Sequence, residues 1–179
     1  QQMIMKYKTT TNLLAAVTLG FAAQANGATI AQFDFTSGSE SSSDTEPVTT
    51  VSDISLAGSS LTGVTYAGNE IRVDGSQTPS SSFNVNPGDN QFFSLTITVP
   101  SGATLDLDDI SFDWGYVNTF GYDLQLRGSA DNFGSTLWTT RRITQDNSPQ
   151  GGSGSANLST IAGYQNVSDD DLTFRFYVA

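Results

Sequence analysis

The sequence lacks both cysteine and histidine, two residue types on which much enzyme chemistry depends. Without cysteine no disulfide can stabilise the fold, so its stability must come from packing, with metal binding as a second source. Without histidine the chain can form neither a Ser-His-Asp nor a Cys-His nucleophile, and it can offer no imidazole to zinc. Hydrolases of these kinds are therefore excluded for the 179 residues.

Positive charge is also scarce: 7 lysines and arginines stand against 18 acidic residues, and the formal net charge is -11. A surface this acidic repels the phosphates of nucleic acids and the headgroups of anionic lipids. We therefore expect no nucleic acid as a partner, and no membrane insertion once the leader described below has been removed.

Glutamate is rare among the acids, with Glu40 and Glu46 in a serine-rich loop and Glu70 at the border of a short predicted strand. A glycoside hydrolase needs two carboxyl groups roughly 5–10 Å apart across a cleft. Nothing in the sequence places two acids in that way, so we predict no catalytic residues and no enzymatic activity. The alternative is a fragment of a secreted glycoside hydrolase whose catalytic acids lie beyond Ala179.

The chain begins with the pattern of a secretory leader. Lys6 and Lys8 precede an uncharged, largely apolar run over residues 13–23, and small residues follow at Ala25 and Gly27. This order of basic, apolar and small residues is typical of a signal peptide. The run is also shorter than the roughly 20 apolar residues that span a bilayer. We therefore predict a signal peptide cut after Ala25 or Gly27, and a protein that is secreted or displayed on the cell surface. The absence of cysteine is ordinary for a bacterial surface protein.

The domain organisation follows from this leader. Residues 1–27 form the signal peptide, with translation expected to start at Met3 or Met5 and the residues before the start not native. Residues 28–179 are enough for a single domain that buries about 68–70% of the surface of its unfolded chain.

Apolar and polar residues alternate with a period of two through much of residues 28–179, and no segment carries a helical stripe. The clearest strands are expected at residues 91–99, 122–126 and 172–178. Weaker strands are expected at residues 30–35, 51–56, 61–66, 70–73 and 136–143. Turn-forming loops are expected at residues 37–49, 75–82, 86–90 and 148–155. We predict an all-β fold, an antiparallel β-sandwich of the jelly-roll kind.

One predicted strand region changes phase. Leu105 and Leu107 share a face, whereas the next apolar set begins at Ile110, which is one residue out of register. An extra residue at Asp108 or Asp109 would restore the phase as a β-bulge, and a tight turn between two short strands would serve as well. We favour the bulge, because so short a turn would usually contain Gly or Asn.

The last predicted strand, residues 172–178, is strongly apolar. If it has no native neighbour, its unpaired edge would promote aggregation. We therefore expect the chain on its own to be less soluble than its charge suggests.

Two clusters of aspartates are candidate calcium ligands. They are Asp106, Asp108 and Asp109, and Asp169, Asp170 and Asp171. Calcium takes about six to eight oxygen ligands, which loops at the end of a sandwich can supply. Neither cluster follows the EF-hand pattern. Two interpretations stay open, namely solvated acids that bind nothing and a structural calcium.

Several aromatic residues lie close together in the second half of the chain. Flat rings on an exposed face can stack on sugars, and the same rings can fill a core. Trp114 and Tyr122 share the phase of the inward residues around them, so we assign both to the core. Tyr116, Phe120 and Trp138 are freer, and they are our candidates for glycan stacking.

Four segments carry a family resemblance: residues 28–35 directly after the leader, 110–114, 124–133 and 172–177. The third segment ends in an S-x-D-x-F loop at Ser129, Asp131 and Phe133. The fourth fits the strand pattern v-x-F-R-x-Y. In these segments the chain resembles exported bacterial proteins that carry a C-terminal PEP-CTERM sorting segment.

The resemblance implies an exported β-sandwich that is processed at the cell envelope and tied to exopolysaccharide or biofilm. It also implies a further strand, a Pro-Glu-Pro motif, a membrane span and a basic tail beyond Ala179, so we expect this sequence to be truncated at its C-terminus. We therefore predict a non-enzymatic surface or matrix protein with polysaccharide as its partner and no required cofactor. The alternative is a carbohydrate-binding module with a structural calcium.

Overall fold

The computed structural model describes residues 3–9, 28–33, 49–60, 64–67, 70–73, 91–116, 122–142 and 150–178. Strands dominate these residues, and the strands pair in antiparallel fashion throughout. The helices in this part of the chain are two 3-10 turns, η1 (Ser129–Asp131) and η2 (Ala162–Tyr164). Neither turn has the length or apolar character to cross a membrane. The predicted all-β class is confirmed.

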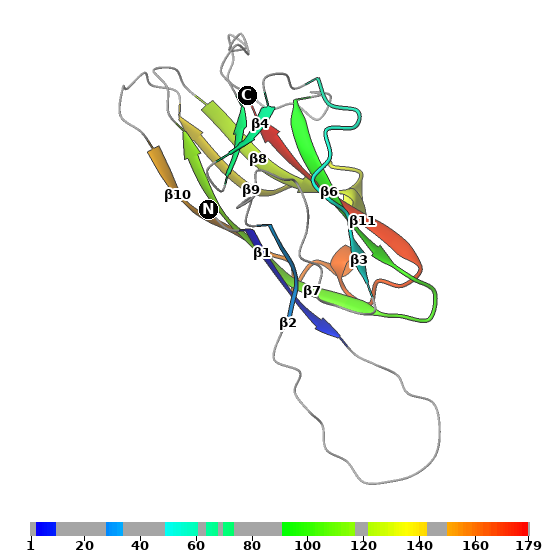
Figure 1. Ribbon diagram of the computed structural model, residues 1–179. Coiled ribbons are helices and arrows are strands. Elements are labelled where there is room, and N and C mark those ends of the chain that lie inside the picture. Colours follow the sequence, from blue (N-terminus) through cyan, green and yellow to red (C-terminus); the bar gives the residue numbers. More distant parts are fainter. Residues whose placement is uncertain are drawn as a thin grey trace, which may run out of the picture.

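The strands make two larger sheets and a small one (Figure 1). The four-stranded sheet has the order β10-β7-β1-β2, the five-stranded sheet has the order β3-β6-β11-β8-β9, and β4 pairs with β5. Their bounds are β1 (Met3–Thr9), β2 (Ala28–Phe33), β3 (Thr50–Val51), β4 (Val64–Ala67), β5 (Glu70–Val73), β6 (Phe92–Val99), β7 (Leu105–Tyr116), β8 (Tyr122–Gly128), β9 (Thr136–Arg142), β10 (Gln150–Asn157) and β11 (Asp170–Val178).

One hydrophobic core takes side chains from both larger sheets. Leu107 of β7, Leu95 of β6 and Phe174 of β11 are all fully buried in it. Phe112 of β7 meets Phe176 of β11 edge-on, with ring centroids 5.1 Å apart and an interplanar angle of 89°. Because burial of apolar surface is the main favourable term in folding, this shared core is what holds the two sheets together.

β7 contains the bulge that its sequence predicts. β1 pairs Lys6 with Asp109 and Tyr7 with Leu107, so Asp108 is an extra residue on β7. The apolar residues on both sides of the bulge are buried, because the extra residue returns the second set to the core face. The bulge is confirmed, and the alternative of a turn between two short strands is wrong, since β7 is continuous.

β1 lies between β7 and β2 in the four-stranded sheet (Figure 1). This differs from the expectation that residues 1–27 stay outside the fold, although residues 10–27 lie outside the described part. The register places Lys8 opposite Asp106, in addition to the pair of Lys6 and Asp109. Cleavage of the leader stays a prediction, and it would remove the strand that β7 and β2 share.

β11 is an interior strand rather than an exposed edge. It pairs with β6 from Asp170 to Tyr177 and with β8 from Phe174 to Val178. The expected low solubility rested on an unpaired C-terminal strand, so that premise is wrong. β5, β6, β9 and β11 lie close to the residues where alternation predicts them, whereas β3 is shorter than expected.

β10 is a strand that the sequence does not predict, because its Gly and Ser content is typical of a loop. It pairs with β7 along its whole length, and Gly154 lies opposite Phe112. A Cβ on Gly154 would lie 2.6 Å from Phe112 Cζ and 2.9 Å from Trp138 Cε2. Because Gly154 has no side chain, the rings of Phe112 and Trp138, one from each larger sheet, can pack against this strand.

We expect Gly154→Ala to destabilise the fold, because the added methyl group would overlap both rings. The free energy of unfolding should fall by about 1–3 kcal/mol, the usual cost of overpacking. Gly152→Ala is the matched control on the same strand, since its Cβ would meet Trp114 Nε1 at an ordinary 3.6 Å. Thermal unfolding measures both variants, and equal melting temperatures would contradict this account.

Candidate functional site

The outer face of the five-stranded sheet carries two arginines on neighbouring strands. Arg175 of β11 lies between the core residues Phe174 and Phe176, so strand alternation turns it away from the core. Arg127 of β8 lies directly opposite Arg175 in the strand register. We use the name "arginine face" for the two arginines and the residues around them: Arg127, Arg175, Gln125, Tyr177, Phe92 and Phe133.

Arg127 is held by hydrogen bonds along its own strand and from the following turn. Its Nε and Nη2 atoms donate to Gln125 Oε1 at 3.1 and 2.7 Å, and its Nη1 atom donates to the Phe133 carbonyl at 3.1 Å. Gln125 in turn donates from Nε2 to Asp123 Oδ2 at 3.1 Å. Arg127 is only 6% exposed and Asp123 only 2% exposed. A buried charge is tolerated when it is hydrogen-bonded in this way.

Arg175 lies between two aromatic rings. Its Cζ atom is 3.8 Å from the centroid of Phe133 and 4.4 Å from the centroid of Phe92. Contacts of this kind attract a cation to the ring face and contribute about 0.5–2 kcal/mol. The Nε atom is nevertheless buried without a hydrogen-bond partner. Its Nη1 atom lies 3.5 Å from the Tyr177 hydroxyl, at the limit of a hydrogen bond.

Two like charges therefore lie side by side on this face. Like charges directly opposite each other on paired strands are destabilising. Within the described part of the chain, neither guanidinium is hydrogen-bonded to a carboxylate. The arrangement is unusual in a chain with a net charge of -11, where acids are plentiful. The nearest carboxylate in this hydrogen-bond network, that of Asp123, is linked to Arg127 only through Gln125.

The turn between β8 and β9 places the Phe133 ring on Arg175. Asn132 and Phe133 both have positive φ angles, of 57° and 61°. A bulky residue in this conformation costs about 1–3 kcal/mol and persists only when its surroundings hold it there. The Asp131 carboxylate accepts hydrogen bonds from the backbone N–H groups of Gly134 at 3.1 Å and Ser135 at 2.8 Å. Hydrogen bonds from Ser135, its side chain first, lower the pKa of Asp131.

Tyr164 of η2 packs under the same turn. Its ring stacks on Phe174 with centroids 5.4 Å apart, and a Cβ on Gly128 would overlap its hydroxyl. Burial raises the pKa of Tyr164 to about 12, and the negative charge of Asp131 adds to this rise. The turn is thus supported from the core side by a tyrosine that strongly prefers to stay neutral.

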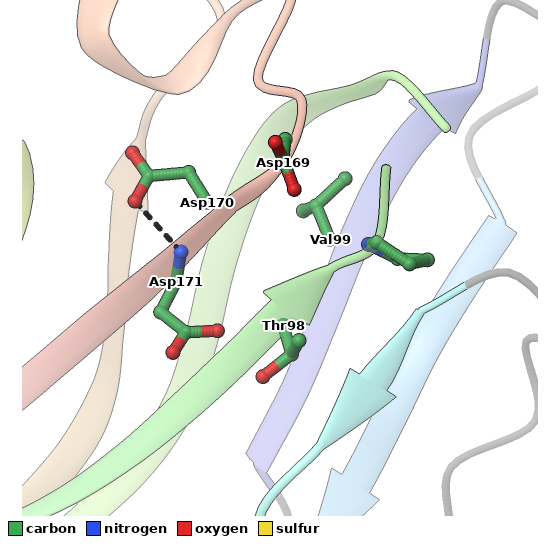
Figure 2. Close-up of a pocket in the computed structure, with 6 residues that line it drawn as sticks. Thr98, Val99, Asp169, Asp170 and Asp171 are labelled. Carbon is green, nitrogen blue, oxygen red and sulfur yellow. Dashed lines mark hydrogen bonds between the residues drawn. The ribbon is translucent and has the colours of Figure 1, made fainter. Parts of the chain in front are cut away.

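A second candidate site lies at one end of the five-stranded sheet (Figure 2). A surface pocket of about 340 Å³ is lined by Thr98, Val99, Pro100, Asp169, Asp170 and Asp171. Asp170 Oδ1 accepts the backbone N–H of Asp171 at 2.8 Å. Figure 2 shows that the three carboxylates point in different directions and do not converge on one point.

The other aspartate cluster lies on β7, next to the bulge. Asp106 Oδ1 accepts the backbone N–H of Asn166 at 2.5 Å, while Asp108 and Asp109 are half-buried. Among the described residues, no three acidic side chains are grouped so that they could hold a metal ion. Calcium requires about six to eight oxygen ligands, so either cluster would need further oxygen donors to bind it. Calcium binding stays a prediction that this geometry does not favour.

Of the three aromatic candidates for glycan stacking, only Trp138 has a side chain among the described residues. Trp138 packs against the core, edge-on to Phe112 with centroids 4.8 Å apart. It shares the core side of the sheet with its pair Leu126, so it is less free than its sequence predicts. The side chains of Tyr116 and Phe120 lie outside the described residues. Glycan stacking by these three residues stays a prediction.

Comparison with known proteins does not assign the chain to a family. The chain matches no known family model, no curated protein and no solved structure. The functional argument therefore depends on the chain's own residues.

The arginine face is the site that sequence reasoning missed. Its two halves lie in the motifs that carry the family resemblance, one ending at Phe133 and the other containing Arg175 and Tyr177. One signal could have pointed to it: in a chain poor in arginine, Arg175 occupies an outward strand position between two inward phenylalanines. Only the pairing of β8 with β11 brings Arg127 next to it.

We expect calcium to leave the melting temperature unchanged beyond the effect of magnesium at the same concentration. Both ions screen the acidic surface alike, whereas the described carboxylates offer no shared site. Thermal unfolding with calcium, magnesium or a chelator tests this. A rise that is specific to calcium and lost in Asp170→Asn would favour the calcium-binding alternative instead.

The raised pKa of Tyr164 predicts a loss of stability at alkaline pH. The unfolded chain releases this proton near pH 10, whereas the folded protein keeps it until about pH 12. The stabilising effect of the neutral phenol is therefore complete below pH 10 and is lost as the pH rises towards 12. Urea unfolding on both sides of pH 10 should show this loss in the native chain and a smaller loss in Tyr164→Phe. An equal loss in both would contradict it.

Proposed function

We propose that this chain is a non-enzymatic bacterial protein that is exported and acts at the cell surface or in the extracellular matrix by binding polysaccharide. In this proposal the two larger sheets pack as a β-sandwich of the jelly-roll kind. The main hydrophobic core, which both sheets share, supports this packing, since the inner faces of a sandwich interdigitate in the same way.

The arginine face is the observation that carries the binding role. It combines the half-buried ring of Phe133 with the guanidinium of Arg175 and the amide of Gln125, all near one another on a sheet surface. Flat rings can stack on sugar rings, while guanidinium and amide groups donate hydrogen bonds to hydroxyl and carboxylate oxygens. Arg175 and Gln125 are mounted on strands, which hold side chains more rigidly than loops do, whereas Phe133 lies in the turn between β8 and β9.

Export is supported by the order of basic, apolar and small residues at the start of the sequence. The resemblance to proteins of the PEP-CTERM sorting class supports a place at the cell envelope. Within this proposal β1 belongs to the precursor, and the exported protein begins close to β2.

When the chain is produced in a bacterium, we expect it outside the cytoplasm with a new N-terminus after Ala25 or Gly27. Cell fractionation followed by intact-mass measurement reads out both the location and the cleavage. Val17→Asp is the control, because a charge in the apolar run should keep the uncleaved chain in the cytoplasm. A native chain that stays in the cytoplasm at full mass would overturn the export proposal.

A further inference from the structure

We propose that the arginine face binds the carboxylate of an acidic sugar, so that the ligand is a polysaccharide rich in uronic acid. This inference rests on the proposed polysaccharide-binding function and names the class of sugar. Arg175 is the residue that contacts the carboxylate, and Arg127 and Phe133 position it.

The geometry of Arg175 limits how a ligand can reach it. Phe133 and Phe92 contact the guanidinium, with ring centroids 3.8 and 4.4 Å from its Cζ atom. Phe92 belongs to β6 and Arg175 to β11, and these two strands lie side by side (Figure 1). The rings occupy the faces of the planar guanidinium, and its Nε atom is buried. The edge formed by Nη1, at 3.5 Å from the Tyr177 hydroxyl, and Nη2 therefore remains for recognition. A carboxylate matches such an edge with two parallel hydrogen bonds, which a neutral hydroxyl cannot make.

The charge balance of the face also favours an anion. Arg127 and Arg175 are paired across neighbouring strands, and the described residues supply no carboxylate that is hydrogen-bonded to either. A bound carboxylate would offset the repulsion between the two cations. It would also reduce the cost of keeping Arg175 half-buried without a counter-ion.

Phe133 connects the two arginines and explains why the site is preorganised. Its ring contacts Arg175 and its carbonyl accepts the hydrogen bond from Arg127, both through a backbone with φ of 61°. Backbone strain of this kind is concentrated at ligand clamps and other functional sites. Because Arg175 is already ordered in the free protein, binding of an anion costs little further conformational entropy.

The surroundings of the site favour a sugar over a phosphate backbone. Thr136 and Thr139 of β9 are exposed next to Gln125, so hydroxyl and amide groups border the arginines. Nucleic acids would require many cations along an extended track, and this chain has a net charge of -11. Near the face, the Debye length of about 8 Å at physiological salt limits repulsion from the more distant acids.

The test compares binding of alginate, a polyuronate, with binding of neutral dextran and of polyglutamate, an acidic peptide. Affinity electrophoresis of the folded chain in gels that contain each polymer gives the apparent affinities. We expect retardation by alginate alone. Retardation by dextran to the same degree would overturn the inference, because the carboxylate would not be recognised. Equal retardation by polyglutamate would overturn it as well, because the sugar would not be recognised.

Variants then locate the site. Arg175→Gln should weaken alginate binding about tenfold or more, the effect of losing charge-assisted hydrogen bonds. Thr160→Asp is the matched control: it changes the net charge equally at an exposed position in the loop after β10, and it should alter binding by less than about twofold. Arg175→Lys keeps the charge but loses the planar fork, so we expect it to bind more weakly than the native chain.

Folding of the variants is checked by their melting temperatures. If Arg175→Gln does not fold, Phe133→Leu replaces it, since the loss of the ring frees Arg175 and should also weaken alginate binding. A folded Arg175→Gln chain that binds alginate as well as the native chain would overturn the inference. A chain that is exported and binds dextran without the help of Arg175 would still have the proposed function. Failure of this inference can therefore be distinguished from failure of the proposed function.

Discussion

The shared hydrophobic core requires every second residue of β6, β8 and β11 to face inward, and this constraint determines the outer face. Phe174 and Phe176 can be buried only if Arg175 between them points outward. The same rule applied to β8 sends Arg127 out beside Leu126. Antiparallel pairing of the two strands then makes the arginines direct neighbours. The polar chemistry of the protein is thus a consequence of how its apolar residues pack.

The arginine face balances unfavourable charge against specific contacts. Two neighbouring cations repel each other, while the rings of Phe92 and Phe133 and the side-chain oxygen of Gln125 offset part of that cost. Phe133 contacts both arginines: its ring packs on Arg175, and its carbonyl accepts a hydrogen bond from Arg127. Its left-handed backbone is held by the hydrogen bonds that Asp131 accepts in the same turn. The strained residue and the charged pair therefore depend on each other.

The packing around β10 shows why composition alone assigned its residues to a loop. A run of Gly and Ser predicts a loop, because glycine gains little from a strand on its own. Next to β7, however, Gly154 is the residue that leaves room for Phe112 and Trp138. The rings supply the packing that the strand itself lacks. Trp138 packs against the core in the same region, although the sequence predicts that it is available to bind a ligand.

The all-β class, most strand positions and the bulge at Asp108 could be predicted from the sequence, because they follow from alternation between neighbouring residues. The absence of histidine and cysteine chemistry also follows from the sequence. Three further features are visible only in the folded chain: β11 is an interior strand, the described aspartates do not converge, and Arg127 and Arg175 are neighbours. Those features depend on strand order and register, which join residues far apart in the chain and leave no periodic trace in the sequence.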